Sequence, residues 1–112
     1  MAKILVIDDE VNIQKFTQAN LTASGYQVFV ASGGEEGLRL AQLERPDLIL
    51  LDLRMTGMSG WDVLMVLKTN RMLRRIPVII MTATMPEAMD QVRSMRTAGY
   101  VIKPFKIGRA HV

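Results

Sequence analysis

The sequence predicts one domain of the α/β class, built on a doubly wound parallel sheet. Two observations predict this class: short aliphatic runs recur along the chain, and stretches with the apolar spacing of helices lie between them. The length of 112 residues fits a single domain. Since each strand is followed by a helix before the next strand, we expect right-handed crossover connections between the strands.

Five runs of strand length make up the expected sheet. Their apolar character is continuous rather than alternating, which indicates strands that are buried on both faces, as in a parallel sheet. The runs are residues 4–7, 28–30, 48–51, 78–81 and 100–102, of which the second and the fifth are the weakest.

Four helical stretches connect these runs. Apolar residues recur in each at helical spacing, and turn-forming residues bound them, such as Ser24-Gly25 after the first and Pro46 after the second. Pro86 stands where a first helical turn accepts proline. The stretches are residues 11–21, 35–43, 61–67 and about 86–98.

Composition narrows the chemistry that the chain can perform. It has no Cys and a single His, His111 near its end, so we expect no disulfide framework, thiol nucleophile or zinc site built from these residues. No apolar run approaches the roughly 18 residues of a membrane span, and no signal peptide precedes the first strand. We therefore expect a cytoplasmic protein without a membrane segment.

Charge is divided unevenly along the chain. Residues 1–67 carry a net charge of −4 and residues 68–112 carry +7, within a total of +3. A basic half is typical of proteins that bind nucleic acid or an acidic partner. Because aromatic residues are not interleaved with these charges and no nucleic-acid motif is present, we expect a solvated basic face or an acidic protein partner rather than nucleic acid.

Polar side chains follow four of the five runs. In open α/β sheets ligands bind at the carboxyl ends of the strands, so these side chains are expected to meet at one edge. Each alone has a simpler role, since aspartates such as Asp8 and Asp9 often cap the following helix. The set is Asp8, Asp9 and Glu10 after the first run, Asp52 after the third, Thr82 after the fourth and Lys103 after the fifth.

Together these groups predict chemistry on phosphate. Clustered carboxylates repel one another unless a cation lies between them, and Mg²⁺ is a hard ion that oxygen ligands hold. A carboxylate can attack phosphorus, while a hydroxyl and an ammonium can hold phosphoryl oxygens. The sequence therefore predicts an aspartyl-phosphate site.

Longer motifs around these residues resemble one family. The segments ILVIDDE (4–10), PDLILLDL (46–53) and IPVIIMTA (76–83), with MSGW (58–61) and YVIKPF (100–105), are similar to the receiver domain of bacterial two-component response regulators. The resemblance covers residues 2 to about 105. It implies a flavodoxin-like, five-stranded sheet of order 2-1-3-4-5, with residues 1–112 as a single receiver domain.

The resemblance also implies a role for each site residue. Asp52 accepts a phosphoryl group from a phosphohistidine of a sensor histidine kinase or a phosphotransfer protein. Mg²⁺ is the implied cofactor, with Asp9 as a direct ligand, Asp8 as a ligand largely through water, and Asp52 and the Arg54 backbone carbonyl as further ligands. The chain would promote only its own phosphorylation and dephosphorylation, so it is not expected to be an enzyme.

Further implied groups bind the phosphoryl oxygens and transmit the signal. The Thr82 hydroxyl and the Lys103 ammonium each hold one oxygen, and Ala83 offers its backbone N–H. Tyr100 turns inward as Thr82 moves towards the phosphate. These changes bias the surface of the fourth helix and the fifth strand, which controls a downstream protein or an output domain.

Three features depart from the family. Thr56 stands where relatives commonly have proline, and Arg54 puts a cation two residues beyond Asp52, where we expect it to alter autodephosphorylation. After Phe105 only residues 106–112 remain, with a glycine among them, which are too few for the family's fifth helix of about three turns. We expect that helix to be short or missing, which would expose an apolar face and favour a homodimer.

Two other classes of function remain open. A Mg²⁺-dependent phosphohydrolase with an Asp nucleophile needs two acids spaced two residues apart after the first strand, which Asp8 and Glu10 match poorly, and it leaves Lys103 unexplained. A phosphate-independent interaction module agrees with Arg54 and with the short end of the chain, but not with the intact acidic set.

Overall fold

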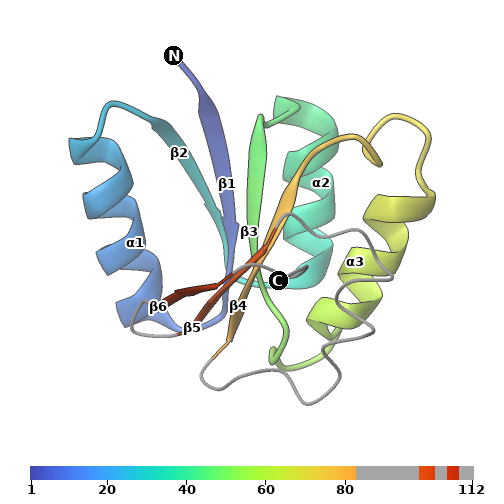
Figure 1. Ribbon diagram of the computed structural model, residues 1–112. Helices are drawn as coiled ribbons and strands as arrows, with labels where there is room; N and C mark the ends of the chain where they lie inside the picture. Colours follow the sequence, from blue (N-terminus) through green and yellow to red (C-terminus); the bar gives the residue numbers. More distant parts are fainter. Residues whose placement is uncertain (83–98, 103–105, 109–112) are drawn as a thin grey trace.

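The chain folds as a sheet flanked by helices in the computed structural model, which describes residues 1–82, 99–102 and 106–108 (Figure 1). The predicted α/β class is confirmed. The helix expected near residues 86–98 lies outside the described residues. In chain order the elements are β1 (Lys3–Ile7), α1 (Val11–Ala23), β2 (Gln27–Ala31), α2 (Gly34–Glu44), β3 (Leu48–Asp52), α3 (Gly60–Thr69), β4 (Val78–Thr82), β5 (Gly99–Ile102) and β6 (Lys106–Gly108).

The strands lie in the order β2-β1-β3-β4-β5-β6. Neighbours among the first five pair in parallel, which confirms the predicted order 2-1-3-4-5. β6 is an addition to the five-stranded sheet that we expected, and it runs antiparallel to β5, with Ile102 opposite Lys106. Part of the stretch that is too short for a fifth helix thus pairs with the edge of β5, whose backbone groups otherwise offer an unpaired row of donors and acceptors.

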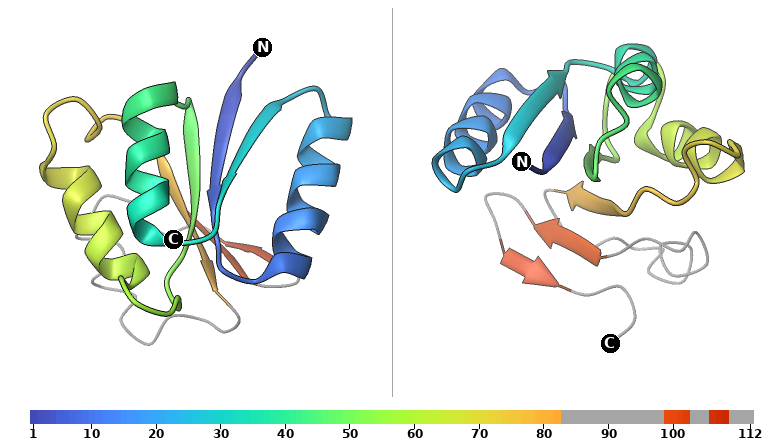
Figure 2. Two further views of the ribbon diagram at one scale, coloured as in Figure 1. Left: turned by 180° about the vertical axis from the view of Figure 1, so that it is seen from behind. Right: turned by 90° about the horizontal axis from the view of Figure 1, so that it is seen from above.

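The helices cover both faces of the sheet. α1 lies on one face beside β1 and β2, and α2 and α3 lie on the other, which is the doubly wound arrangement (Figure 2). The element bounds differ from the predicted ones by one or two residues, because capping rather than apolar spacing decides where an element ends. No helix in the described part of the chain is long and apolar enough to cross a membrane.

The face under α2 and α3 is closely packed. Two glycines let α2 approach its neighbours: a Cβ on Gly34 would lie 2.7 Å from Val63 Cγ2, and a Cβ on Gly37 would lie 2.6 Å from Ile7 Cδ1. The buried cluster on this face draws on four strands and both helices, and its members include Leu5, Ile7, Ile49, Leu51, Val78, Ile80, Val63, Leu64 and Leu67.

The face under α1 has a smaller core. Its buried residues are Ile4, Val6, Leu50 and Met81. α1 itself buries only Thr17 among its residues, while Phe16 is 52% exposed. Among the described residues, more apolar side chains are therefore buried under α2 and α3 than under α1.

Candidate functional site

Two of the acidic residues predicted for the site, Asp8 and Asp52, lie at the carboxyl ends of β1 and β3. Val6 and Leu50 lie side by side on the α1 face, and the alternation of side chains along a strand places Asp8 and Asp52 next in the same rows. The Asp8 backbone N–H donates to the Ala31 carbonyl at 3.1 Å, which carries the pairing of β1 with β2 beyond the last residue of β1.

Asp8 is fully buried and orders the turn into α1. Its Oδ1 accepts a hydrogen bond from the Glu10 backbone N–H at 2.9 Å, and its carbonyl accepts one from Gln14 Nε2. Glu10 is the N-cap residue of α1 and makes no capping bond with its side chain. Glu10, rather than Asp8 or Asp9, is therefore the N-cap residue of α1, and Asp8 bonds to its backbone N–H.

Asp52 is the last residue of β3 and is 2% exposed. Its Oδ1 accepts a hydrogen bond from the Arg54 backbone N–H at 3.1 Å, which limits rotation of the carboxylate. The Gly60 N–H donates to the Leu53 carbonyl at 3.0 Å, so the start of α3 lies against the end of β3. A Cβ on Gly60 would collide with the Asp52 carbonyl oxygen, so this close approach requires glycine.

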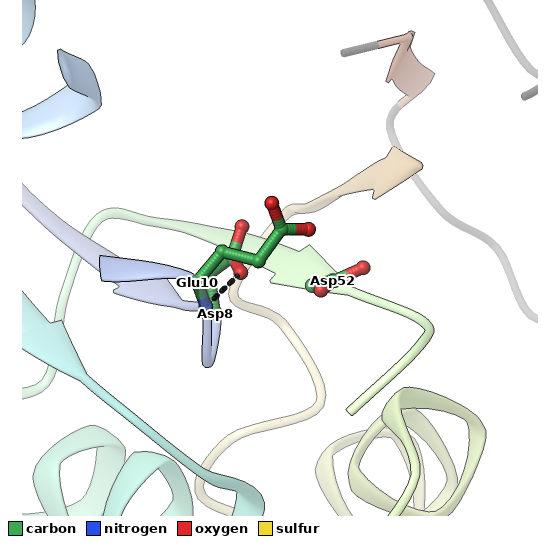
Figure 3. Close-up of side chains that lie close together, drawn as sticks. All are labelled: Asp8, Glu10 and Asp52. Carbon is green, nitrogen blue, oxygen red and sulfur yellow. Dashed lines mark hydrogen bonds between the residues drawn. The ribbon is translucent and has the colours of Figure 1, made fainter. Parts of the chain in front are cut away.

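Three carboxylates meet at this edge of the sheet. Asp8, Glu10 and Asp52 each offer an oxygen, and these oxygens lie within 4.8 Å of one another (Figure 3). Asp8 and Asp52 are buried and Glu10 is exposed, so the group opens to solvent on one side. Several carboxylate oxygens at this separation are the donor set of a hard divalent cation such as Mg²⁺, and the residues present fit such an ion.

Asp9 lies beside this group, but its carboxylate bonds elsewhere. Asp9 Oδ2 accepts hydrogen bonds from both the backbone N–H and the Oγ1 hydroxyl of Thr56, at 3.0 and 3.2 Å. Within the described residues, the acidic group at 4.8 Å contains Glu10 and not Asp9. The role of Asp9 as a direct Mg²⁺ ligand stays a prediction.

Of the other residues predicted for the site, the structure describes Thr82, Tyr100 and Arg54. Thr82 ends β4, one residue after Met81, which is the register partner of Asp52. Tyr100 lies in β5 opposite Ile80. Arg54 is exposed on the segment after β3. Ala83 and Lys103 lie outside the described residues.

Two residues have contacts at the site that were not predicted: Glu10, which was expected at this edge but not as a Mg²⁺ ligand, and Thr56, which was noted only for standing in place of proline. Glu10 joins Asp8 because the chain bends at Asp9, where Asp8 Oδ1 accepts from the Glu10 N–H, and apolar periodicity does not predict this bend. Thr56 is 47 residues from Asp9 in sequence, and no local pattern predicts that contact.

Comparison with known proteins places these residues in a family. The chain matches the response regulator receiver domain over residues 4–111. It is 40% identical over 105 residues to the alkaline phosphatase synthesis transcriptional regulatory protein PhoP of Bacillus subtilis, covering 92% of this chain and 42% of that protein. It is 42% identical over 107 residues to the transcriptional regulatory protein KdpE of Mycobacterium tuberculosis, covering 94% of this chain and 46% of that protein. The chain thus spans less than half the length of these curated relatives.

Solved structures show the same fold. The chemotaxis protein CheY4 of Vibrio cholerae superposes with a TM-score of 0.87 at 31% identity, over 95% of this chain and 89% of that one. The N-terminal domain of a response regulator receiver protein from Methanoculleus marisnigri JR1 superposes with a TM-score of 0.87 at 37% identity, over 93% and 85% of the two chains.

Proposed function

The chain belongs to the family of response regulator receiver domains, and we propose that Asp52 is its phosphoacceptor. Receiver domains of two-component response regulators are phosphoacceptor signalling switches, and this is the function of the chain. The observation that supports Asp52 is its position: it is 2% exposed at the carboxyl end of β3, with Asp8 and Glu10 carboxylate oxygens within 4.8 Å.

The proposed reaction is transfer of a phosphoryl group. A carboxylate oxygen of Asp52 forms a bond to phosphorus while the bond from phosphorus to a histidine nitrogen of the donor protein breaks, and the electron pair stays on the imidazole. The donor is a sensor histidine kinase or a phosphotransfer protein. The Arg54 backbone N–H holds Asp52 Oδ1 and so helps to orient the carboxylate for this attack.

The acidic group supports Mg²⁺ as the cofactor. Asp8, Asp52 and Glu10 would hold it, with Asp9 and the Arg54 carbonyl as the further ligands that the family resemblance implies. When bound, Mg²⁺ neutralises part of the charge that gathers as the phosphoryl group approaches the carboxylates. Asp8 and Asp52 bring two buried carboxyl groups to the site, and a cation would stabilise their charged forms.

The proposal also gives four other residues a role in binding the phosphoryl group or in transmitting the signal. Thr82 and Lys103 hold phosphoryl oxygens, Ala83 offers its N–H, and Tyr100 responds to the movement of Thr82. The position of Thr82 at the end of β4, next to the residue paired with Asp52, supports its part. The influence of Arg54 on hydrolysis of the phosphate stays a prediction.

The signal passes to a partner. PhoP and KdpE, which are named as transcriptional regulators, are more than twice as long as the matched segment, and this supports control of an output domain or a downstream protein. We do not propose direct nucleic-acid binding by the residues described here. The reaction modifies the chain itself, so we do not class it as an enzyme.

Phosphorylation by a small-molecule donor tests the proposal. Acetyl phosphate with Mg²⁺ is expected to add one phosphoryl group to the wild-type chain, seen by intact-protein mass spectrometry, and EDTA is expected to prevent it. Asp52→Asn removes the nucleophile and is expected to abolish the added mass. Asp47→Asn is the matched control. Asp47 is an exposed carboxylate whose Oδ2 accepts from the Lys3 N–H, at the amino ends of β1 and β3, whereas the site lies at their carboxyl ends. Equal labelling of Asp52→Asn and wild type would exclude Asp52 as phosphoacceptor.

A further inference from the structure

A pair of hydrogen bonds ties the segment after β3 to the residue after Asp8. Thr56 donates both its backbone N–H and its hydroxyl to the same oxygen, Asp9 Oδ2, at 3.0 and 3.2 Å. The two partners come from different loops of the chain, so the pair joins the end of β1 to the segment that leads from β3 into α3.

The two Thr56 bonds hold the middle of the segment between β3 and α3, where the structure describes no other hydrogen bond. At its start the Arg54 N–H bonds to Asp52, and at its end Ser59 and Asp62 form a capping box on α3. Among the described residues, hydrogen bonds that leave positions 55–58 come only from Thr56. The next residue, Gly57, has a φ of +77°, a backbone conformation that glycine adopts without strain.

The two hydrogen bonds from Thr56 also hold Asp9 Oδ2 towards the segment between β3 and α3. Asp9 is absent from the group of oxygens within 4.8 Å that Asp8, Glu10 and Asp52 form in the described part of the chain. No Asp9 oxygen belongs to that group, so the Asp9 carboxylate has to turn to become a ligand of a cation bound among those three. Turning it moves Oδ2 away from the two Thr56 donors and so weakens their bonds. Binding of the cation and release of the loop are therefore linked, because each uses the same carboxylate.

We propose that Thr56 is a positioning residue that latches Asp9 to the β3–α3 loop and weakens Mg²⁺ binding until the latch opens. The inference rests on the part of the proposed function that makes Asp9 a metal ligand. It is specific to this residue type, because threonine offers two donors here, whereas proline offers neither an N–H nor a hydroxyl.

Mg²⁺ affinity of the unphosphorylated protein, measured by calorimetric titration, tests the latch. Thr56→Val keeps the shape and the backbone N–H but loses the hydroxyl, and it is expected to bind Mg²⁺ about three- to tenfold more tightly, the range for the net contribution of one ordinary hydrogen bond. Thr56→Ser keeps both donors and is expected to bind as wild type does. Affinity in Thr56→Val that equals or falls below the wild-type value would overturn the proposal.

A double-mutant cycle separates the latch from a general loosening of the loop. In an Asp9→Asn background the carboxylate ligand is gone, so Thr56→Val is expected to change the Mg²⁺ affinity by less than about twofold. An equal gain in both backgrounds would show that Thr56 acts without Asp9 and would contradict the proposal.

Hydrogen exchange gives a readout that does not depend on affinity. The Thr56 amide is expected to exchange slowly without Mg²⁺, faster at saturating Mg²⁺, and fast under both conditions in Asp9→Ala, which removes the acceptor. Slow exchange that Mg²⁺ leaves unchanged would refute the latch. If wild type is phosphorylated and Asp52→Asn is not, but the Thr56 variants bind Mg²⁺ with wild-type affinity, the latch alone is rejected. A wild-type chain that binds no Mg²⁺ would reject both the latch and the proposed cofactor.

Discussion

The two faces of the sheet differ in what covers them and in what they carry. On the α2 and α3 face, the inward residues of four strands pack under two helices, with Leu64 and Leu67 fully buried. On the α1 face, one described helix lies beside β1 and β2 (Figure 2), and it buries only Thr17. In the part of the chain that the structure describes, the first face thus has the larger core, and the second has a smaller, partial one.

The partial face is also the one that leads to the functional site. Its rows run through Val6 and Leu50 and end in the buried carboxylates Asp8 and Asp52. Burial of like charges lowers stability unless a cation or hydrogen bonds compensate for it. From this difference we expect the α2 and α3 face to supply most of the stabilisation, while the α1 face carries the buried polar groups Asp8 and Asp52 that serve function.

The largest expected effect tests whether stability depends on the α2 and α3 face. Leu64→Ala removes a fully buried side chain from α3 and is expected to lower the free energy of unfolding by about 2–5 kcal/mol, measured by urea denaturation. Leu21→Ala is the matched change on the other face, where Leu21 is only partly buried, and its cost is expected to be less than half as large. Equal costs for the two substitutions would contradict the difference between the faces.

The second effect concerns what covers the α1 face. We expect a homodimer across it, because Val11 and Phe16 on α1 are 56% and 52% exposed. Phe16→Ser is expected to weaken association about tenfold or more, seen by light scattering over a range of concentrations. Met65→Ser is the control, since Met65 is 59% exposed on α3, on the opposite face, and its loss is expected to leave association unchanged. A strictly monomeric wild-type chain at high concentration would exclude the dimer.

Much of the fold follows from the sequence because the strands are continuous apolar runs. The runs at 4–7, 48–51 and 78–81 became β1, β3 and β4 with bounds shifted by one residue at most. β6 could not be predicted in this way, because residues 106–108 carry no apolar run and owe their strand to pairing with the edge of β5. An edge pairing depends on which backbone groups remain open in the folded sheet, and a single segment does not encode that.

The site was predictable where residues end strands and less so where loops meet. Asp8 and Asp52 were expected at one edge because parallel strands bring their carboxyl ends together, and the structure places their oxygens within 4.8 Å of each other. The bonds from Thr56 to Asp9 depend on the course of two loops, which apolar periodicity does not define. The ligands could therefore be predicted from the sequence only by residue type. The structure adds which carboxylates lie together, namely Asp8, Glu10 and Asp52.

The smallest expected effect examines the one residue that α1 buries. Thr17 is 4% exposed, and its Oγ1 has no hydrogen-bond partner among the described residues, so burial of the hydroxyl costs free energy. Thr17→Val keeps the shape and has nearly the same helix propensity, so we expect the free energy of unfolding to rise by up to about 1 kcal/mol in urea denaturation. Thr22→Val on the exposed side of α1 is the control and is expected to change stability by less than about 0.5 kcal/mol. A clear loss of stability in Thr17→Val would show that the hydroxyl is hydrogen-bonded in solution and would contradict a cost for its burial on the α1 face.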